Sequence, residues 1–112
     1  MKNWESHIKH FGSYLKLERS LSGNSIQAYV RDVEKLAQFI EMKFAGISPL
    51  VISTRHLQAF LQYINELGMS AFSQARILSG LKAFYKYLLF EELIVKDPTA
   101  LIEGPKLGRK LP

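Results

Sequence analysis

Apolar residues recur every three or four positions along almost the whole chain, and this spacing constrains the fold more than any other feature. In the first segment they fall at steps of four, three and four residues, at Trp4, Ile8, Phe11 and Leu15. Such spacing lays the side chains along one stripe of an α-helix. No segment shows the alternation that is typical of a half-buried β-strand. The sequence therefore predicts an all-α protein.

Side chains that cap helices divide this pattern into four segments, since Asn and Ser accept hydrogen bonds from the first turn of a helix. The predicted N-caps are Asn3, Ser22, Ser53 and Ser70. The first two helices are expected to end near residues 20 and 46, and Gly68 is well placed to stop the third. The core-facing positions of the later three helices are predicted to be Ile26, Val30, Val33, Ala37, Ile40, Leu57, Phe60, Leu61, Ile64, Leu67, Ile77, Leu81, Phe84 and Leu88, with Leu36 on the flank of the stripe.

The C-terminal segment reads differently from the helices. Asp97 and Pro98 have the form of a cap and a first-turn proline, so a short turn is expected at residues 99–102. Residues 104–112 are interrupted by Gly and Pro and have no periodicity, which is typical of a linker or a flexible tail. The predicted architecture is a compact four-helix domain over residues 1–103, followed by this tail.

The composition agrees with one folded domain and excludes several classes of protein. The chain has 112 residues, of which 47% are hydrophobic and 22% are charged, so it is too apolar for a disordered protein. It contains no cysteine, which excludes disulfide scaffolds, thiolate zinc sites and cysteine nucleophiles. Its apolar runs fall far short of the roughly 18 residues of a membrane span, and no secretory leader is recognisable. We therefore expect a cytoplasmic protein that makes no membrane contact.

Catalytic and metal-binding patterns are missing from the sequence. His7 and His10 lie one helical turn apart and could chelate a metal, but no HExxH pattern or carboxylate cluster accompanies them, so surface histidines are the better interpretation. His56 falls in the first turn of the third predicted helix, where we expect it to face solvent. Neither a Gly-rich phosphate loop nor a GxSxG motif is present. We therefore expect no catalytic site, no metal and no cofactor in this chain.

The charge distribution favours a polyanionic partner. The formal net charge is +5 at pH 7, and the excess is concentrated, because no acidic residue occurs between Glu66 and Glu91. Three cations fall inside that gap, namely Arg76, Lys82 and Lys86. Three more lie in the tail, namely Lys106, Arg109 and Lys110.

Small and cationic side chains share the polar face of the fourth predicted helix. At about 100° per residue, the residues opposite its apolar stripe are Ala75, Ser79, Lys82, Ala83 and Lys86, with Arg76 on the flank. Ala and Ser let a phosphate backbone come close, while Lys and Arg supply charge and Ser supplies hydrogen bonds. This face is therefore suited to bind nucleic acid.

The second predicted helix has a weaker version of the same pattern. Its polar face carries Asn24, Gln27, Ala28, Arg31 and Lys35. Asn, Gln and Arg can read base edges in a major groove, although the acidic residues at positions 32 and 34 dilute the charge. The alternative is that both faces are ordinary solvated helix surfaces. Four aromatic residues could stack on bases, but their spacing fits the core better; they are Tyr29, Phe84, Tyr85 and Tyr87.

Two segments resemble the N-terminal core-binding domain of Xer-type tyrosine recombinases, within the phage integrase family. The first, residues 11–40, reads FGSYLKLERSLSGNSIQAYVRDVEKLAQFI. It is similar to the family's aromatic-x-x-Tyr-Leu, Leu-Ser-x-Asn-Ser/Thr and Tyr-x-x-Asp patterns. The second, residues 70–112, reads SAFSQARILSGLKAFYKYLLFEELIVKDPTALIEGPKLGRKLP. It is similar to the family's Ser-x-x-Arg-x-Leu-Ser-x-Leu-Lys/Arg-x-Phe-Tyr-x-Tyr-Leu helix, its Asn/Asp-Pro pair and its basic linker.

The resemblance implies a fold and a DNA-binding surface. Four helices form two crossed hairpins that close over one side of a recombination-site duplex, with the second and fourth helices facing the DNA. By position, the implied contacts on the second helix are Asn24, Ser25, Ala28 and Arg31, beside Lys35 on the same polar face. On the fourth helix they are Ser73, Arg76, Ser79, Lys82 and Lys86.

The resemblance also implies what this chain lacks. In the family the catalytic residues, including the nucleophilic Tyr, belong to a following C-terminal domain, so residues 104–112 are expected to be the linker to it. The full enzyme would cleave DNA through a 3′-phosphotyrosyl link without metal or nucleotide. Its partners would be double-stranded DNA and other recombinase subunits, whereas the domain alone is expected to be a monomer. Gly80 stands where the family usually has Ala, and Val30 where it often has Arg.

Two functions remain as alternatives to a recombinase domain. One is a small helical repressor, which would bind its operator tightly as a dimer with regular half-site spacing. The other is a helical protein-interaction module that uses its apolar and aromatic surface.

Overall fold

Four α-helices account for most of the computed structural model, which describes residues 2–105. They are α1 (Lys2–Leu17), α2 (Gly23–Lys43), α3 (Thr54–Glu66) and α4 (Ala71–Phe90). A short 3₁₀ turn, η1 (Pro49–Val51), lies between α2 and α3. Residues 2–105 contain no β-strand. The predicted all-α, four-helix fold is confirmed.

Three of the four predicted helix starts are also confirmed. The Ser22 hydroxyl accepts a hydrogen bond from the Ser25 backbone N–H at 3.2 Å, and Ser70 caps α4 in the same way. At α3 the backbone N–H of Ser53 donates to Nδ1 of His56 at 3.0 Å. The prediction for Asn3 is wrong, because α1 already includes Lys2. An Asn is tolerated within the first turn, where backbone N–H groups lack intrahelical partners, so its presence does not fix where a helix begins.

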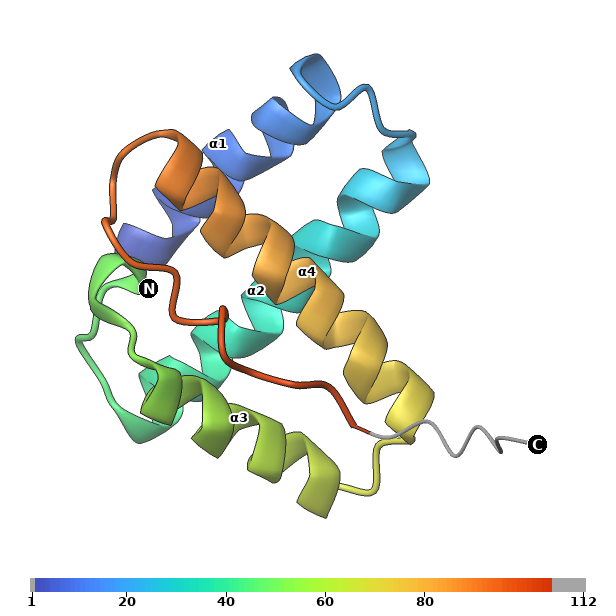
Figure 1. Cartoon of the computed structure of the whole chain (residues 1–112), viewed down its shortest axis with the longest axis vertical. Coiled ribbons are helices and arrows are strands. Elements are labelled where there is room, and N and C mark those ends of the chain that lie inside the picture. The colour runs from blue at the N-terminus through green and yellow to red at the C-terminus, as the bar shows by residue number, and fades with distance from the viewer. Residues whose placement is uncertain (1, 106–112) are drawn as a thin grey trace.

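The helices pair into two hairpins that cross each other. Figure 1 shows α1 and α2 joined at one end, α3 and α4 joined at another, and α4 running across α2. The most extensive contact between any two elements is the one between α2 and α4. The chain after α4 returns along the side of α3 (Figure 1). The crossing of α2 and α4 therefore sets the relative position of the two polar faces.

Aromatic rings build the core beneath this crossing. The ring of Phe84 lies 5.3 Å from that of Phe11 and 5.1 Å from that of Tyr85, measured between centroids. The Tyr85 hydroxyl donates to the Pro49 carbonyl at 3.0 Å, and Trp4 Nε1 donates to the Ile47 carbonyl at 2.9 Å. Both polar atoms are thereby satisfied inside the core.

The predicted core is confirmed at most positions. The buried ones are Trp4, Ile8, Phe11, Leu15, Val33, Leu36, Ala37, Ile40, Leu57, Phe60, Ile64, Ile77, Leu81, Phe84 and Leu88. Ile26, Val30 and Leu61 pack against this core while partly buried. The prediction that Leu67 faces the core is wrong, since 65% of the residue is exposed. α3 ends at Glu66, so Leu67 lies outside the helical stripe that the spacing assumed.

The C-terminal segment is tied to the helices. The Asp97 carboxylate accepts hydrogen bonds from the Thr99 backbone N–H at 2.8 Å and from its hydroxyl at 2.7 Å, which forms the predicted turn. The Thr54 hydroxyl donates to the Pro98 carbonyl at 2.8 Å, and Ile102 is buried. The basic part of the predicted tail, 106–112, lies outside the described residues. Between residues 2 and 105 no helix is long and apolar enough to cross a membrane.

Candidate nucleic-acid interface

The predicted DNA-contacting side chains lie on the surface of α2 and α4. All of them are exposed except Ala28, which is half-buried; the exposed ones are Asn24, Ser25, Arg31, Lys35, Ser73, Arg76, Ser79, Lys82 and Lys86. Lys35, Ser73 and Arg76 line one shallow hollow at the crossing, together with Phe72. Lys86 lies ten residues beyond Arg76 on α4, or roughly 15 Å along the helix axis. The two faces therefore come together around Arg76, in the N-terminal half of α4.

Arg76 is the side chain that joins the two helices. Its Nη2 donates to the Asp32 carboxylate and, at 3.4 Å, to the Ala28 carbonyl, both on α2. Its Cζ lies 5.8 Å from the centroid of the Tyr29 ring, within the range of a cation–π contact. The side chain is still 46% exposed. The stretch of α4 that is free of acid in the sequence therefore has an acidic neighbour in space, supplied by α2.

Asp32 is the buried half of this ion pair. Only 4% of it is exposed, and burial raises the pKa of its carboxyl to about 6, against the opposing effects of the hydrogen bond and charge of Arg76 and the charges of Lys35 and Arg31. The sequence alone predicts a surface charge at this position, and this prediction is wrong because the carboxylate is buried against α4. Its place four residues before the core residue Leu36 is the signal that could have shown it on the buried stripe.

Gly80 provides the space that Asp32 occupies. A Cβ at this position would lie 2.1 Å from Oδ2 of Asp32 and 2.8 Å from its Cβ. The two helices therefore come together closely at a residue that has no side chain. A glycine inside a helix lowers stability by about 0.5–1 kcal/mol relative to alanine. At position 80 the glycine is required because any side chain would overlap the buried Asp32.

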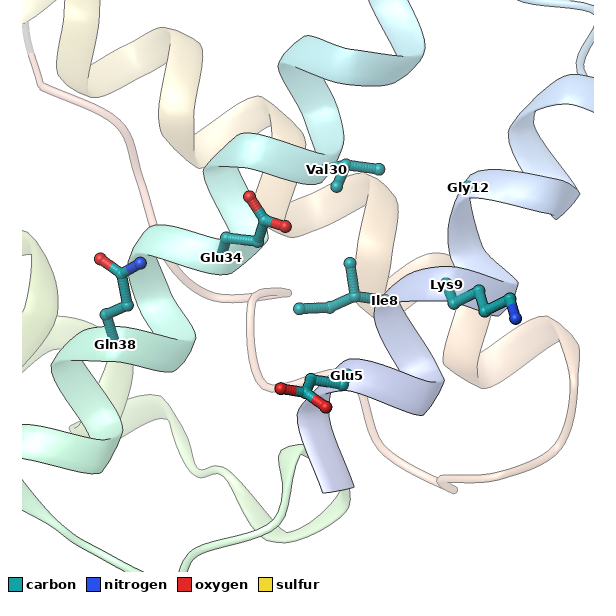
Figure 2. Close-up of a pocket in the computed structure, with 7 residues that line it drawn as sticks. All are labelled: Glu5, Ile8, Lys9, Gly12, Val30, Glu34 and Gln38. Atoms are coloured by element: carbon teal, nitrogen blue, oxygen red, sulfur yellow. The ribbon is translucent and has the colours of Figure 1, made fainter. Parts of the chain in front are cut away.

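A second hollow, between α1 and α2, has the opposite electrostatic character. It encloses about 550 Å³ and is lined by Glu5, Ile8, Lys9, Gly12, Val30, Glu34 and Gln38. Figure 2 shows Ile8 and Val30 projecting into it from facing helices, with the carboxylates of Glu5 and Glu34 beside them and Lys9 directed away. Two carboxylates disfavour a polyanion here. The surface suited to nucleic acid is thus the side of α2 that meets α4.

The chain is similar to a known protein family over most of its length. The family model for the phage integrase N-terminal SAM-like domain matches residues 8–92. The chain belongs to this family. The resemblance noted in the sequence is thereby confirmed, and the matched part is the N-terminal domain of the family.

Curated relatives extend the match over nearly the whole chain. A protein named tyrosine recombinase XerD from Staphylococcus saprophyticus is 41% identical over 94% of this chain. Proteins of the same name from Chlorobaculum tepidum and Rhizobium meliloti are 34% and 35% identical over 97% and 96% of it. The chain spans only about a third of the length of these relatives, 35%, 35% and 34% respectively. No solved structure is significantly similar to this integrase-family domain.

The aromatic and histidine residues of the integrase-family domain have structural places. Phe84, Tyr85 and Tyr87 are buried, as their core spacing predicted, whereas Tyr29 is half-buried beside Arg76. His56 is half-buried rather than facing solvent, because it caps α3 and its ring lies 4.8 Å from that of Phe44. Partial burial and the nearby His10 both lower the pKa of His7. Within residues 2–105 no group of three or more His, Asp or Glu could hold a metal ion.

The raised pKa of Asp32 predicts how the stability of this integrase-family domain depends on pH. The carboxyl of the folded protein binds its proton more tightly than that of the unfolded chain. The contribution of this proton to the free energy of unfolding is therefore fully present below about pH 4 and is lost as the pH rises through about 6. Chemical denaturation of the wild type and of Asp32→Asn from pH 4 to 7.5 checks this. The free energy of unfolding of the wild type, relative to the variant, should fall between pH 4 and 6.5 and then level off. Glu34→Gln, which removes an exposed carboxylate on the same helix, is the matched control. A rising difference for Asp32→Asn would contradict the assignment.

Proposed function

We propose that this chain is the DNA-binding domain of a site-specific tyrosine recombinase, and that it holds one side of the recombination-site duplex through α2 and α4. The observation that carries the proposal is the exposure of both polar faces at the helix crossing, on a helix pair where α4 has no acidic residue of its own. Membership in the integrase family and the name of the relatives support it.

The side chains of the two faces suggest a division of labour. Lys82 and Lys86 on α4, with Arg31 and Lys35 on α2, supply positive charge for phosphates. Ser73 and Ser79 donate hydrogen bonds to phosphate oxygens of the DNA, as Ser25 does at the start of α2. Asn24 is suited to read a base edge in the major groove. The half-buried Ala28 lets the duplex approach α2.

Catalysis belongs, in this proposal, to a part of the protein outside the chain. The match to only about a third of each relative supports this, since the matched third is the N-terminal domain. Residues 1–103 then form the DNA-binding domain, and residues 104–112 lead to the catalytic one. The full protein acts on DNA in the cytoplasm, together with further recombinase subunits and without a cofactor. The domain alone is a monomer.

Replacing Lys82 with alanine tests the interface. Affinity for duplex DNA should fall steeply with salt, and the variant should lower the slope of log K against log salt by about 0.9, the effect of one lost phosphate contact. Fluorescence anisotropy with a labelled duplex at several salt concentrations measures it. Lys9→Ala is the matched control, because Lys9 is exposed on the acidic hollow between α1 and α2. That variant should leave the slope unchanged.

Other outcomes would favour the alternatives. An equal loss of slope in both lysine variants would mean that net charge alone matters and that α4 is no interface. Tight binding of a dimer to a two-fold symmetric site would indicate a repressor. A lack of any DNA binding at low salt, with binding to a protein partner instead, would indicate an interaction module.

A further inference from the structure

The guanidinium of Arg76 is anchored by the protein through only some of its hydrogen-bond donors. Among residues 2–105, its Nη2 alone is hydrogen-bonded, to Asp32 and Ala28. The Nε and Nη1 atoms carry three more N–H groups, and 46% of the side chain is exposed. Its Cζ also lies over the Tyr29 ring, 5.8 Å from the ring centroid. Arg76 is therefore anchored through Nη2 between α2 and α4 and keeps further donors on a side chain that solvent can reach.

The surroundings leave room for a large partner to reach those donors. Ser73 and Ser79 lie three residues before and after Arg76 on α4, and both are small and exposed. On α2 the backbone carbonyl that Arg76 contacts is that of Ala28, another small residue. The small residues leave an opening through which a groove edge of a duplex could come within hydrogen-bond distance of Arg76, beside the exposed side chains of Phe72 and Lys35.

The charge of the pair disfavours a phosphate as the partner. Asp32 is ionised at neutral pH and bonded to the same guanidinium, so the pair has no net charge and an approaching phosphate meets a carboxylate as well as a cation. A guanine edge is uncharged and offers two acceptors, O6 and N7, to a planar arginine fork. A base edge suits this paired arginine better than a phosphate does.

We propose that Asp32 positions Arg76 to read one guanine of the target duplex, so that Arg76 contributes sequence preference rather than salt-dependent affinity. This inference rests on the proposed DNA-binding function. It gives the two charged faces different tasks: Lys82 and Lys86 neutralise phosphates, whereas Arg76 selects a base pair. Asp32 is a positioning residue, because it acts on DNA only through Arg76.

The experiment begins with the wild-type 112-residue chain and a pool of randomised duplexes. Sequencing of the bound fraction gives the preferred site, and anisotropy titrations then measure affinity for that site and for each single-base-pair change. The wild type should prefer guanine at one position by about tenfold. Arg76→Lys, which keeps the charge but loses the planar fork, should reduce this preference to about twofold or less. Its salt slope and its affinity for unrelated duplexes should stay within about twofold of the wild type.

Asp32→Asn separates positioning from folding. The variant keeps the shape of the side chain and removes its charge, so the preference at the same base pair should fall several-fold while the affinity for unrelated duplexes rises. A merely structural role would lower both affinities together. Arg55→Lys on α3 is the matched control, since Arg55 is exposed and away from the crossing. It should leave the preference unchanged, and circular dichroism should show that all variants are folded.

Two results would overturn the inference in distinguishable ways. If Arg76→Lys leaves the base preference intact, or Arg76→Ala lowers affinity uniformly and reduces the salt slope by about one phosphate contact, Arg76 binds backbone and the proposed function stands. If the wild type binds no duplex at low salt, the inference and the proposed function fail together.

Discussion

Replacement of Phe84 with alanine is expected to lower the free energy of unfolding by about 3–5 kcal/mol. Phe84 is fully buried, and its ring lies 5.3 Å from that of Phe11 and 6.3 Å from that of Trp4, both on α1. It also contacts Tyr85 and Tyr87 on its own helix. The substitution removes one of the rings that join α4 to α1 and leaves a cavity that rigid aromatic neighbours fill poorly.

Denaturant titration followed by circular dichroism measures the loss, and the chain offers a control within the same helix. Phe72 is also a phenylalanine of α4, but 71% of it is exposed. Phe72→Ala should therefore change the free energy of unfolding by no more than about 0.5 kcal/mol. Comparable losses in the two variants would show that burial at Phe84 is not what stabilises the contact between α1 and α4.

The parts of the fold that can be predicted from the sequence depend on interactions between residues a few positions apart. A serine accepts a hydrogen bond from a residue three positions later, as Ser22 and Ser70 do, so such a cap is visible in a few letters. Gly68 ends α3 with φ of +89°, a conformation that favours glycine. Core spacing within one helix is equally local. The wrong predictions for Asn3 and Leu67 also concern helix ends, because neither residue type shows whether it lies just inside a helix or just outside it.

The candidate interface could be predicted only in part, because some of its contacts join residues that lie far apart in the sequence. Exposure of Lys82 and Lys86 follows from helical periodicity alone. The pairing of Arg76 with Asp32 spans 44 residues and depends on how α2 crosses α4. A gap in acidic residues along the sequence carries no information about an acid that another helix brings to the same place. The role of Gly80 is hidden for the same reason, since a glycine in a helix shows a cost but not the neighbour that needs its space.

Replacement of Gly80 with alanine is expected to destabilise the domain by about 2–3 kcal/mol, although alanine is the better helix former. The new Cβ would stand 2.8 Å from the Cβ of Asp32, which cannot move away as the end of a long side chain could. Either α2 and α4 separate or the carboxylate leaves its buried place beside Arg76. Both cost more than the 0.5–1 kcal/mol that alanine gains from backbone entropy. The free energy of unfolding measured by urea titration checks the sign.

Gly23→Ala separates the clash from the general effect of glycine removal. Gly23 is the first residue of α2 and has no atom within 4 Å of the position of a Cβ, so alanine there should be neutral or stabilising by up to about 1 kcal/mol. If Gly80→Ala also stabilised the domain, α2 and α4 could not be in the close contact that places Asp32 against Arg76. With the expected loss, the same variant should reproduce the weakened base preference of Asp32→Asn, because an alanine at position 80 displaces the carboxylate that orients Arg76. A stability defect with base preference intact would show that Arg76 is held mainly by Ala28 and Tyr29, and that Asp32 serves the packing of the two helices alone.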